Sequence, residues 1–147
     1  MSSPARDAPI IHIVGVCGSG KSSLARRLNQ RGYQARQISQ EHSGVPDLWR
    51  WRCTPDALVY LDASNESIRQ RYPKLNLTDE YLQEERRRLA HARKHADCVI
   101  LTDDLDLDQV AERALACLKS KGVEPDNRRS GREEDGGIGG SAQDEQP

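Results

Sequence analysis

The sequence lacks any long hydrophobic run: its 147 residues contain no apolar stretch of membrane-spanning length, and no signal-like segment comes before the first motif. A transmembrane helix needs roughly 18 consecutive apolar residues, so we expect no membrane partner. The four cysteines form no C-x-x-C pair and have no metal-site spacing. These absences predict a reducing, cytoplasmic location and four free thiols, with Cys98 and Cys117 on apolar faces of the core.

Features of nucleic-acid motors and GTPases are also missing. The formal net charge is only -1, divided into +3 for residues 1–121 and -4 for residues 122–147. The basic residues are not interleaved with aromatic ones, and the chain is too short for the usual two lobes of a motor. No N-K-x-D motif for reading a guanine base occurs. We therefore expect no nucleic-acid partner and no GTPase.

Both ends of the chain lack the apolar residues that a core requires. Residues 122–147 hold six of the 11 glycines and seven acidic residues, but only two aliphatic side chains larger than alanine, Val123 and Ile138. Such a segment buries too little surface to offset the entropy of ordering. We predict disordered ends at 1–8 and 122–147, flanking one domain at 9–121.

Within that domain, apolar runs alternate with segments of helical periodicity. The pattern predicts strands at 10–14, about 33–38, 56–62 and 97–101, and helices at 21–31, 65–72, 78–95 and from 107 to about 121. Residues 39–55 are predicted as a loop or short helix. Alternation of this kind indicates a three-layer α/β/α fold with a short parallel sheet. The weak second strand belongs at an edge, which gives the order 2-1-3-4.

The first strand ends in GVCGSGKS, the G-x-x-x-x-G-K-S pattern of a phosphate-binding loop, and a helix follows. Glycines let successive backbone N–H groups converge on a phosphate, lysine supplies a positive charge, and the serine hydroxyl can ligate Mg²⁺. The predicted cofactors are therefore ATP or another NTP, with Mg²⁺. The predicted binding residues are Gly15, Cys17, Gly18, Ser19, Gly20, Lys21, Ser22 and Ser23. Because Cys17 lies inside this loop, it is expected to react with thiol reagents.

Three segments, GVCGSGKSSLARRL, PDALVYLDASNESIRQRY and HADCVILTDDLDLDQVAERALACL, resemble the small-molecule kinases among P-loop proteins, such as adenylate, shikimate and adenylylsulfate kinases. The resemblance covers about residues 9–121. It implies transfer of the γ-phosphoryl group of ATP, with lid arginines near Arg69 and Arg71. These kinases have an extra acceptor-binding segment between the second and third strands, where this chain offers only about 40–54. The acceptor is therefore small, held by a partner subunit in a possible oligomer, or absent.

Phosphoryl transfer requires a metal ligand and, for a hydroxyl acceptor, a carboxylate near the nucleophile. Glu41 follows the second strand and is expected at the same sheet edge as the loop, where it could serve either purpose. Asp62 ends the apolar third strand and competes for the metal, and Asp47 is a further alternative. Each could instead be a solvated carboxylate at a strand end. We predict Ser22, Glu41 and Asp62 as candidate metal ligands, and Lys21, Glu41, Arg69 and Arg71 as catalytic residues.

The remaining charged and aromatic side chains allow two interpretations each. Arg69 and Arg71 could bind the transferring phosphoryl group or lie on a solvated helix face. Most of Arg86, Arg87 and Arg88 are expected at the surface. Trp49 and Trp51 could stack on a ligand ring or close the open end of the sheet. The sequence thus predicts a small-molecule or nucleotide kinase, with a nucleotide-binding regulatory module as the alternative and an unidentified phosphoryl acceptor.

Overall fold

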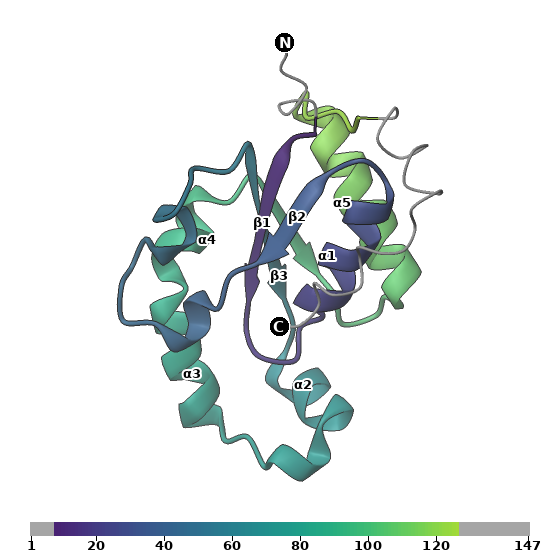
Figure 1. Ribbon diagram of the computed structural model, residues 1–147. Helices are drawn as coiled ribbons and strands as arrows, with labels where there is room; N and C mark the ends of the chain where they lie inside the picture. The colour runs from purple at the N-terminus through teal and green to yellow at the C-terminus, as the bar shows by residue number, and fades with distance from the viewer. Residues whose placement is uncertain (1–7, 127–147) are drawn as a thin grey trace.

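The computed structural model describes residues 8–126, and its centre is a sheet of four parallel strands. The strands are β1 (Ile10–Gly15), β2 (Gln34–Gln37), β3 (Ala57–Asp62) and β4 (Cys98–Leu101). Their spatial order is β2-β1-β3-β4, with parallel pairing throughout. Helices cover both faces of the sheet (Figure 1). The predicted α/β fold and the predicted strand order are therefore confirmed.

Two helices cover one face of the sheet, α1 (Lys21–Gln30) and α5 (Leu107–Ser120) (Figure 1). The apolar positions of α1, Leu24, Ala25 and Leu28, recur at helical spacing and are all buried against the strands. Asp106 caps α5: its carboxylate accepts the Gln109 N–H at 2.8 Å, and the Gln109 side chain accepts the Asp106 N–H at 2.9 Å. This reciprocal pair satisfies two N–H groups that a helix start otherwise leaves free.

Three elements pack on the opposite face: α3 (Asp79–Arg88), α4 (Ala90–His95) and the 3-10 helix η3 (Leu48–Arg50). Their buried side chains, including Trp49, Leu82 and Leu89, pack on Val14, Leu58 and Tyr60 of the sheet. A second 3-10 helix, η2 (Gln40–His42), directly follows β2. Helix α2 (Asn65–Arg71) and η4 (Pro73–Leu75) lie beyond the carboxyl ends of the strands (Figure 1).

The helix predicted at 78–95 is interrupted, and that prediction is wrong in this detail. Leu89 separates α3 from α4, with φ -95° and ψ -3°, and its N–H is shared between the carbonyls of Glu85 and Arg86. Neither glycine nor proline occurs at the break, so the sequence contains no signal for it. The fully buried Leu89 side chain packs in the core beneath both helices.

The chain continues to make contacts beyond the predicted domain end at Lys121. Val123 donates its N–H to Leu118 O at 2.8 Å, and its carbonyl accepts the Tyr33 hydroxyl at 2.7 Å. Asp126 donates its N–H to Gly32 O at 2.9 Å. Residues 122–126 therefore pack along the edge of the domain. The rest of the predicted disordered tail, 127–147, and residues 1–7 lie outside the described residues.

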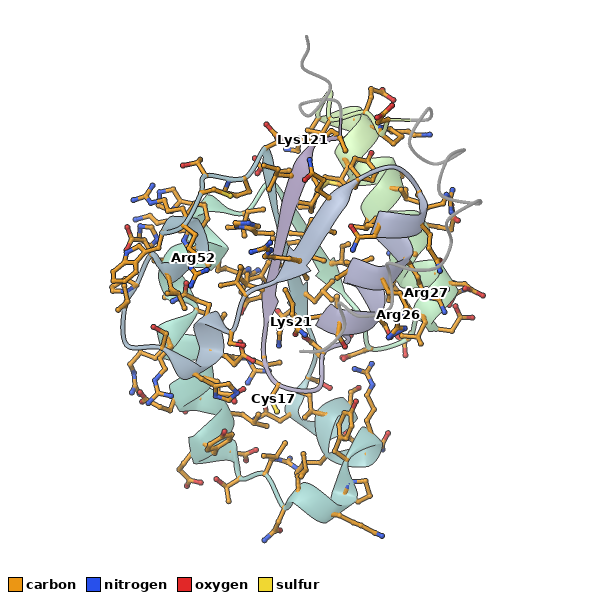
Figure 2. All side chains as sticks on the ribbon, viewed as in Figure 1. Cys17, Lys21, Arg26, Arg27, Arg52 and Lys121 are labelled. Carbon is orange, nitrogen blue, oxygen red and sulfur yellow. A yellow bond between two sulfur atoms is a disulfide. The ribbon has the colours of Figure 1, made fainter. Side chains whose placement is uncertain are left out.

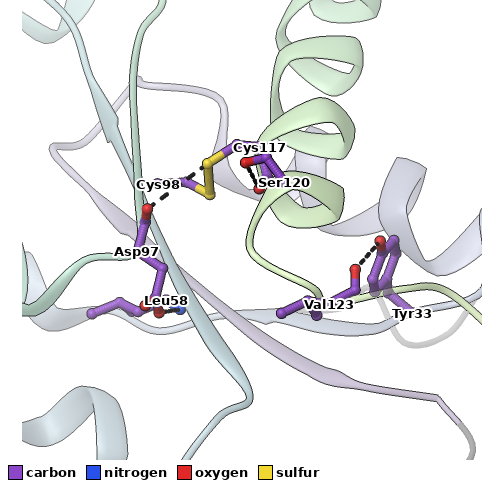
Figure 3. Close-up of a disulfide and its surroundings, with 7 residues drawn as sticks. All are labelled: Tyr33, Leu58, Asp97, Cys98, Cys117, Ser120 and Val123. Atoms are coloured by element: carbon purple, nitrogen blue, oxygen red, sulfur yellow. Dashed lines mark hydrogen bonds between the residues drawn. A yellow bond between two sulfur atoms is a disulfide. The ribbon is translucent and has the colours of Figure 1, made fainter.

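A disulfide joins Cys98 of β4 to Cys117 of α5, with the two Cα atoms 6.1 Å apart (Figure 3). The prediction of four free thiols is therefore wrong, and only Cys17 and Cys53 are free. The cause is the packing of α5 on the edge strand, which brings two cysteines 19 residues apart within bridging distance. The predicted cytoplasmic location stays a prediction. Among residues 8–126, no helix combines the length and apolarity needed to cross a membrane.

Candidate functional site

The phosphate loop, Gly15–Ser22, connects the end of β1 to the first turn of α1 at the carboxyl edge of the sheet (Figure 2). Gly18 and Gly20 have φ values of 81° and 99°, in the left-handed region that glycine adopts without strain. Ser19 closes a turn by donating its N–H to Val16 O at 3.1 Å. Helix α1 begins at Lys21, so the positive end of its dipole faces the loop.

Lys21 is buried inside the loop, with only 6% of the residue exposed. Its ammonium group donates to Gly15 O at 3.0 Å, to Val16 O at 3.3 Å and to the Glu41 carboxylate at 3.0 Å. An ammonium has three N–H donors, so these three acceptors use all of them. Lys21 must therefore exchange at least one of these contacts in order to reach a phosphate.

Of the candidate carboxylates, Glu41 is the one in contact with the phosphate loop. It lies in η2 after β2, and because β2 pairs in parallel with β1, both strands end at the same sheet edge. Asp62 lies at the end of β3, where its carboxylate accepts the Ala63 N–H at 2.9 Å. Its side chain lines a cavity of about 320 Å³ with Tyr60, Arg86 and Arg93. Asp47 pairs with Arg50 at 3.3 Å.

The two candidate arginines have different environments. Arg71 donates to Gly18 O at 3.0 Å and to the carbonyl and hydroxyl oxygens of Thr102 at 3.2 and 3.3 Å. Its guanidinium therefore lies against the phosphate loop. Arg69 pairs instead with Asp79 at 2.6 Å. This pairing, followed by a hydrogen bond from Asn65, lowers the pKa of Asp79, so the ion pair persists at neutral pH.

Glu85 of α3 is a site residue that sequence reasoning missed. Its carboxylate accepts the Cys17 N–H at 2.9 Å, and the residue is fully buried. A signal for it exists in the sequence: Glu85 lies between Leu82 and Leu89 on the inward face of its helix, where a charged residue is costly unless it has a partner. Burial, and then the charge of Glu85, raises the pKa of the Cys17 thiol. The thiol is thus protonated at neutral pH and less reactive than expected.

The serines of the motif differ in exposure. Ser22 is exposed in the first turn of α1, Ser23 is half-buried, and Ser19 is buried with no hydrogen-bond partner for its hydroxyl among residues 8–126.

Residues 8–126 have no group of three His, Cys, Asp or Glu side chains placed to hold a metal. Mg²⁺ at phosphate sites usually takes one or two protein oxygens plus phosphates and waters. The exposed Ser22 hydroxyl and the unpartnered Oε1 of Glu41 fit that requirement.

The tryptophans and the arginine triplet lie mostly on the face that carries α3 and α4. Trp49 is buried, and its indole N–H donates to His91 Nδ1 at 3.1 Å, so it belongs to the core. Trp51 is 62% exposed. Arg86 donates to Ala63 O and to the Asn65 side chain, both at 2.6 Å. Arg87 is exposed and Arg88 is half-buried; each pairs with Glu84.

A comparison with curated proteins finds no match to this chain. Residues 11–106 match a protein family described as the viral superfamily 1 RNA helicase core domain. The matched segment runs from β1 through the phosphate loop and all four strands to the cap of α5. It covers about two thirds of the chain. The chain therefore belongs to the viral superfamily 1 RNA helicase core domain family, which is a family of P-loop NTPases.

Proposed function

We propose that this protein binds a nucleoside triphosphate with Mg²⁺ at the phosphate loop and transfers the γ-phosphoryl group to a small hydroxyl compound, as a kinase. One observation carries the proposal: a buried carboxylate, Glu41, lies 3.0 Å from the loop lysine, Lys21. Transfer to a hydroxyl needs such a carboxylate beside the phosphates. The resemblance of three segments to small-molecule kinases supports the same activity.

Each residue has a distinct part in the proposed reaction. Lys21 leaves Glu41 and binds the β- and γ-phosphates, together with the N–H groups of the phosphate loop. Ser22 would hold Mg²⁺, which would supply charge neutralisation on the phosphate oxygens when bound. Arg71, already at the loop, donates to the transferring group. Glu41 accepts the proton of the attacking hydroxyl, directly or through water.

Calorimetric titration with MgATP tests the binding step. We expect Lys21→Ala to weaken the Kd by at least about 100-fold, because phosphate binding loses its charge-assisted donor. Arg26→Ala is the matched control: Arg26 is an exposed cation on the same helix (Figure 2), and its removal should leave the Kd unchanged. Equal affinity of the Lys21 variant and the wild type would contradict nucleotide binding at this loop.

Labelled ATP tests the transfer step. Glu41→Gln should reduce turnover by about 10²- to 10⁴-fold, the range for loss of a general base, while MgATP binding persists. If nucleotide binds but no acceptor becomes labelled and no phosphate is released, the protein is a regulatory module and not a kinase.

The family match favours a second candidate function, NTP hydrolysis coupled to RNA, in which water takes the place of the acceptor. Phosphate release should then occur without any small-molecule acceptor and rise on addition of single-stranded RNA. Such a result would also overturn the expectation that nucleic acid is not a partner.

A further inference from the structure

Two buried carboxylates, Glu41 of η2 and Glu85 of α3, flank the phosphate loop. They are 4% and 0% exposed. Each uses one oxygen at the loop: Glu41 Oε2 accepts from Lys21 Nζ, and Glu85 Oε1 accepts from the Cys17 N–H. The other two oxygens, Glu41 Oε1 and Glu85 Oε2, have no hydrogen-bond partner among the described residues. The Tyr81 hydroxyl also interacts with the Glu85 carboxylate. Because a buried carboxylate oxygen without a donor is costly, Glu41 Oε1 in particular indicates a missing donor.

His42 lies between the two carboxylates and is the part of this cluster that reaches solvent. Its Nε2 is 3.5 Å from Glu41 Oε2, its Nδ1 is 3.8 Å from Glu85 Oε2, and its side chain is 49% exposed. Neither distance is short enough for a good hydrogen bond. His42 thus lies where solvent comes nearest to the two buried carboxylates.

The charge balance of this cluster changes when a nucleotide binds. Lys21 neutralises Glu41 in the present arrangement, but it is the residue that binds phosphate in the proposed function. Once Lys21 turns to the phosphates, Glu41 loses its cation, while Glu85 keeps neutral donors, the Cys17 N–H and the Tyr81 hydroxyl. The two carboxylates then attract a hydrogen-bond donor or a positive charge and repel an anion.

We propose that Glu41 and Glu85 form the binding site for the phosphoryl acceptor, and that the acceptor is an amino alcohol or polyol without negative charge. This proposal rests on the phosphoryl-transfer function above. The hydroxyl oxygen of the acceptor bonds to the γ-phosphorus, and Glu41 accepts the proton of that hydroxyl. The bond from that phosphorus to the β,γ-bridging oxygen breaks, and ADP leaves with the electron pair. Glu85 Oε2 accepts a hydrogen bond from a second hydroxyl or an ammonium of the same molecule.

Matched acceptors test the proposal on the wild-type chain with γ-labelled ATP. The first set is 3-amino-1,2-propanediol, glycerol and glycerate, which share a size but differ in charge, and the second is adenosine and AMP. We expect kcat/KM at least tenfold higher for the cationic or neutral member of each set than for the anionic one. Preference for glycerate or AMP would overturn the acceptor assignment and leave transfer intact. Labelling of none, with MgATP still bound, would overturn both this assignment and the kinase function.

Glu85→Gln separates acceptor binding from a structural role. A glutamine retains an oxygen for the Cys17 N–H but loses the negative charge. We expect KM for 3-amino-1,2-propanediol to rise at least tenfold, with a smaller change in kcat, an unchanged melting temperature and a Kd for MgATP within twofold. Glu84→Gln is the matched control, because its side chain pairs with Arg87 and Arg88 outside the cluster, and it should leave KM unchanged. An unchanged KM in the Glu85 variant, or equal losses for every acceptor and for MgATP, would contradict the proposal.

Discussion

At Gly15 the phosphate loop comes closest to the neighbouring strand β3. A Cβ atom at this position would lie 2.4 Å from Leu61 O and 2.7 Å from the Ser19 hydroxyl. The first contact is with backbone of a central strand, which cannot move without disturbing its pairing with β1 and β4. Glycine is required here by space as much as by the geometry of phosphate binding.

Gly15→Ala should lower the free energy of unfolding by about 1–3 kcal/mol, the usual cost of forcing an added methyl group into a packed site. Gly44→Ala is the control, since its Cβ would meet nothing within 4 Å. That change should alter stability by no more than about 0.5 kcal/mol. Urea denaturation of the two variants measures both effects, and equal stabilities would show that the loop adjusts to the methyl group at no cost.

Single residues also show how far the site could be predicted. The loop from Gly15 to Ser22 could be identified because its glycine, lysine and serine residues have the spacing that phosphate binding requires. Glu41 and Asp62 could not be ranked from sequence, because both lie near the carboxyl ends of strands and the choice depends on which side chain turns toward Lys21. Glu85 is 68 residues away from Cys17 in the chain. Only the packing of α3 against η2 brings that carboxylate to the loop.

At the scale of elements, the alternation of strands and helices predicted the parallel sheet, because parallel strands need crossover connections. The weak second strand, placed at an edge, gave the strand order. The break within the predicted helix and the disulfide between two elements could not be predicted from the sequence. The interruption at Leu89 depends on how two helices share one core. The bond between Cys98 and Cys117 depends on the position of α5 along β4, which apolar periodicity does not determine.

Reduction of this disulfide should destabilise the domain. The bond closes a loop of 19 residues, and cross-links of that length typically contribute about 3 kcal/mol by restricting the unfolded chain. We expect a lower melting temperature in dithiothreitol for the wild type, but not for a Cys98→Ala/Cys117→Ala variant. Thiol counting by mass spectrometry checks the premise: two alkylated cysteines in the unreduced denatured protein and four after reduction. Four in the unreduced protein would restore the original prediction.

At the scale of the whole molecule, the two ends of the described chain lie at the same end of the sheet (Figure 1). Ala8 O accepts a hydrogen bond from the Gln34 side chain at 2.7 Å, while residues 122–126 reach Gly32 and Tyr33. Burial, and then the charge of Glu124, raises the pKa of Tyr33 to about 12. Its hydroxyl therefore remains a donor to Val123 O throughout the neutral range. The segment that follows α5 is thus bonded to the turn that leads into the edge strand β2.

Two truncations measure what residues 122–126 contribute to the domain. A chain that ends at Lys121 lacks the Tyr33–Val123 and Asp126–Gly32 hydrogen bonds, whereas a chain that ends at Asp126 retains both. At about 0.5–1.5 kcal/mol for each bond, the shorter chain should be less stable by about 1–3 kcal/mol in urea denaturation. Tyr33→Phe adds an internal check, because it should destabilise the longer chain by about 1 kcal/mol and the shorter one hardly at all. Equal stability of the two truncations would place the functional end of the domain at Lys121, as composition alone predicts.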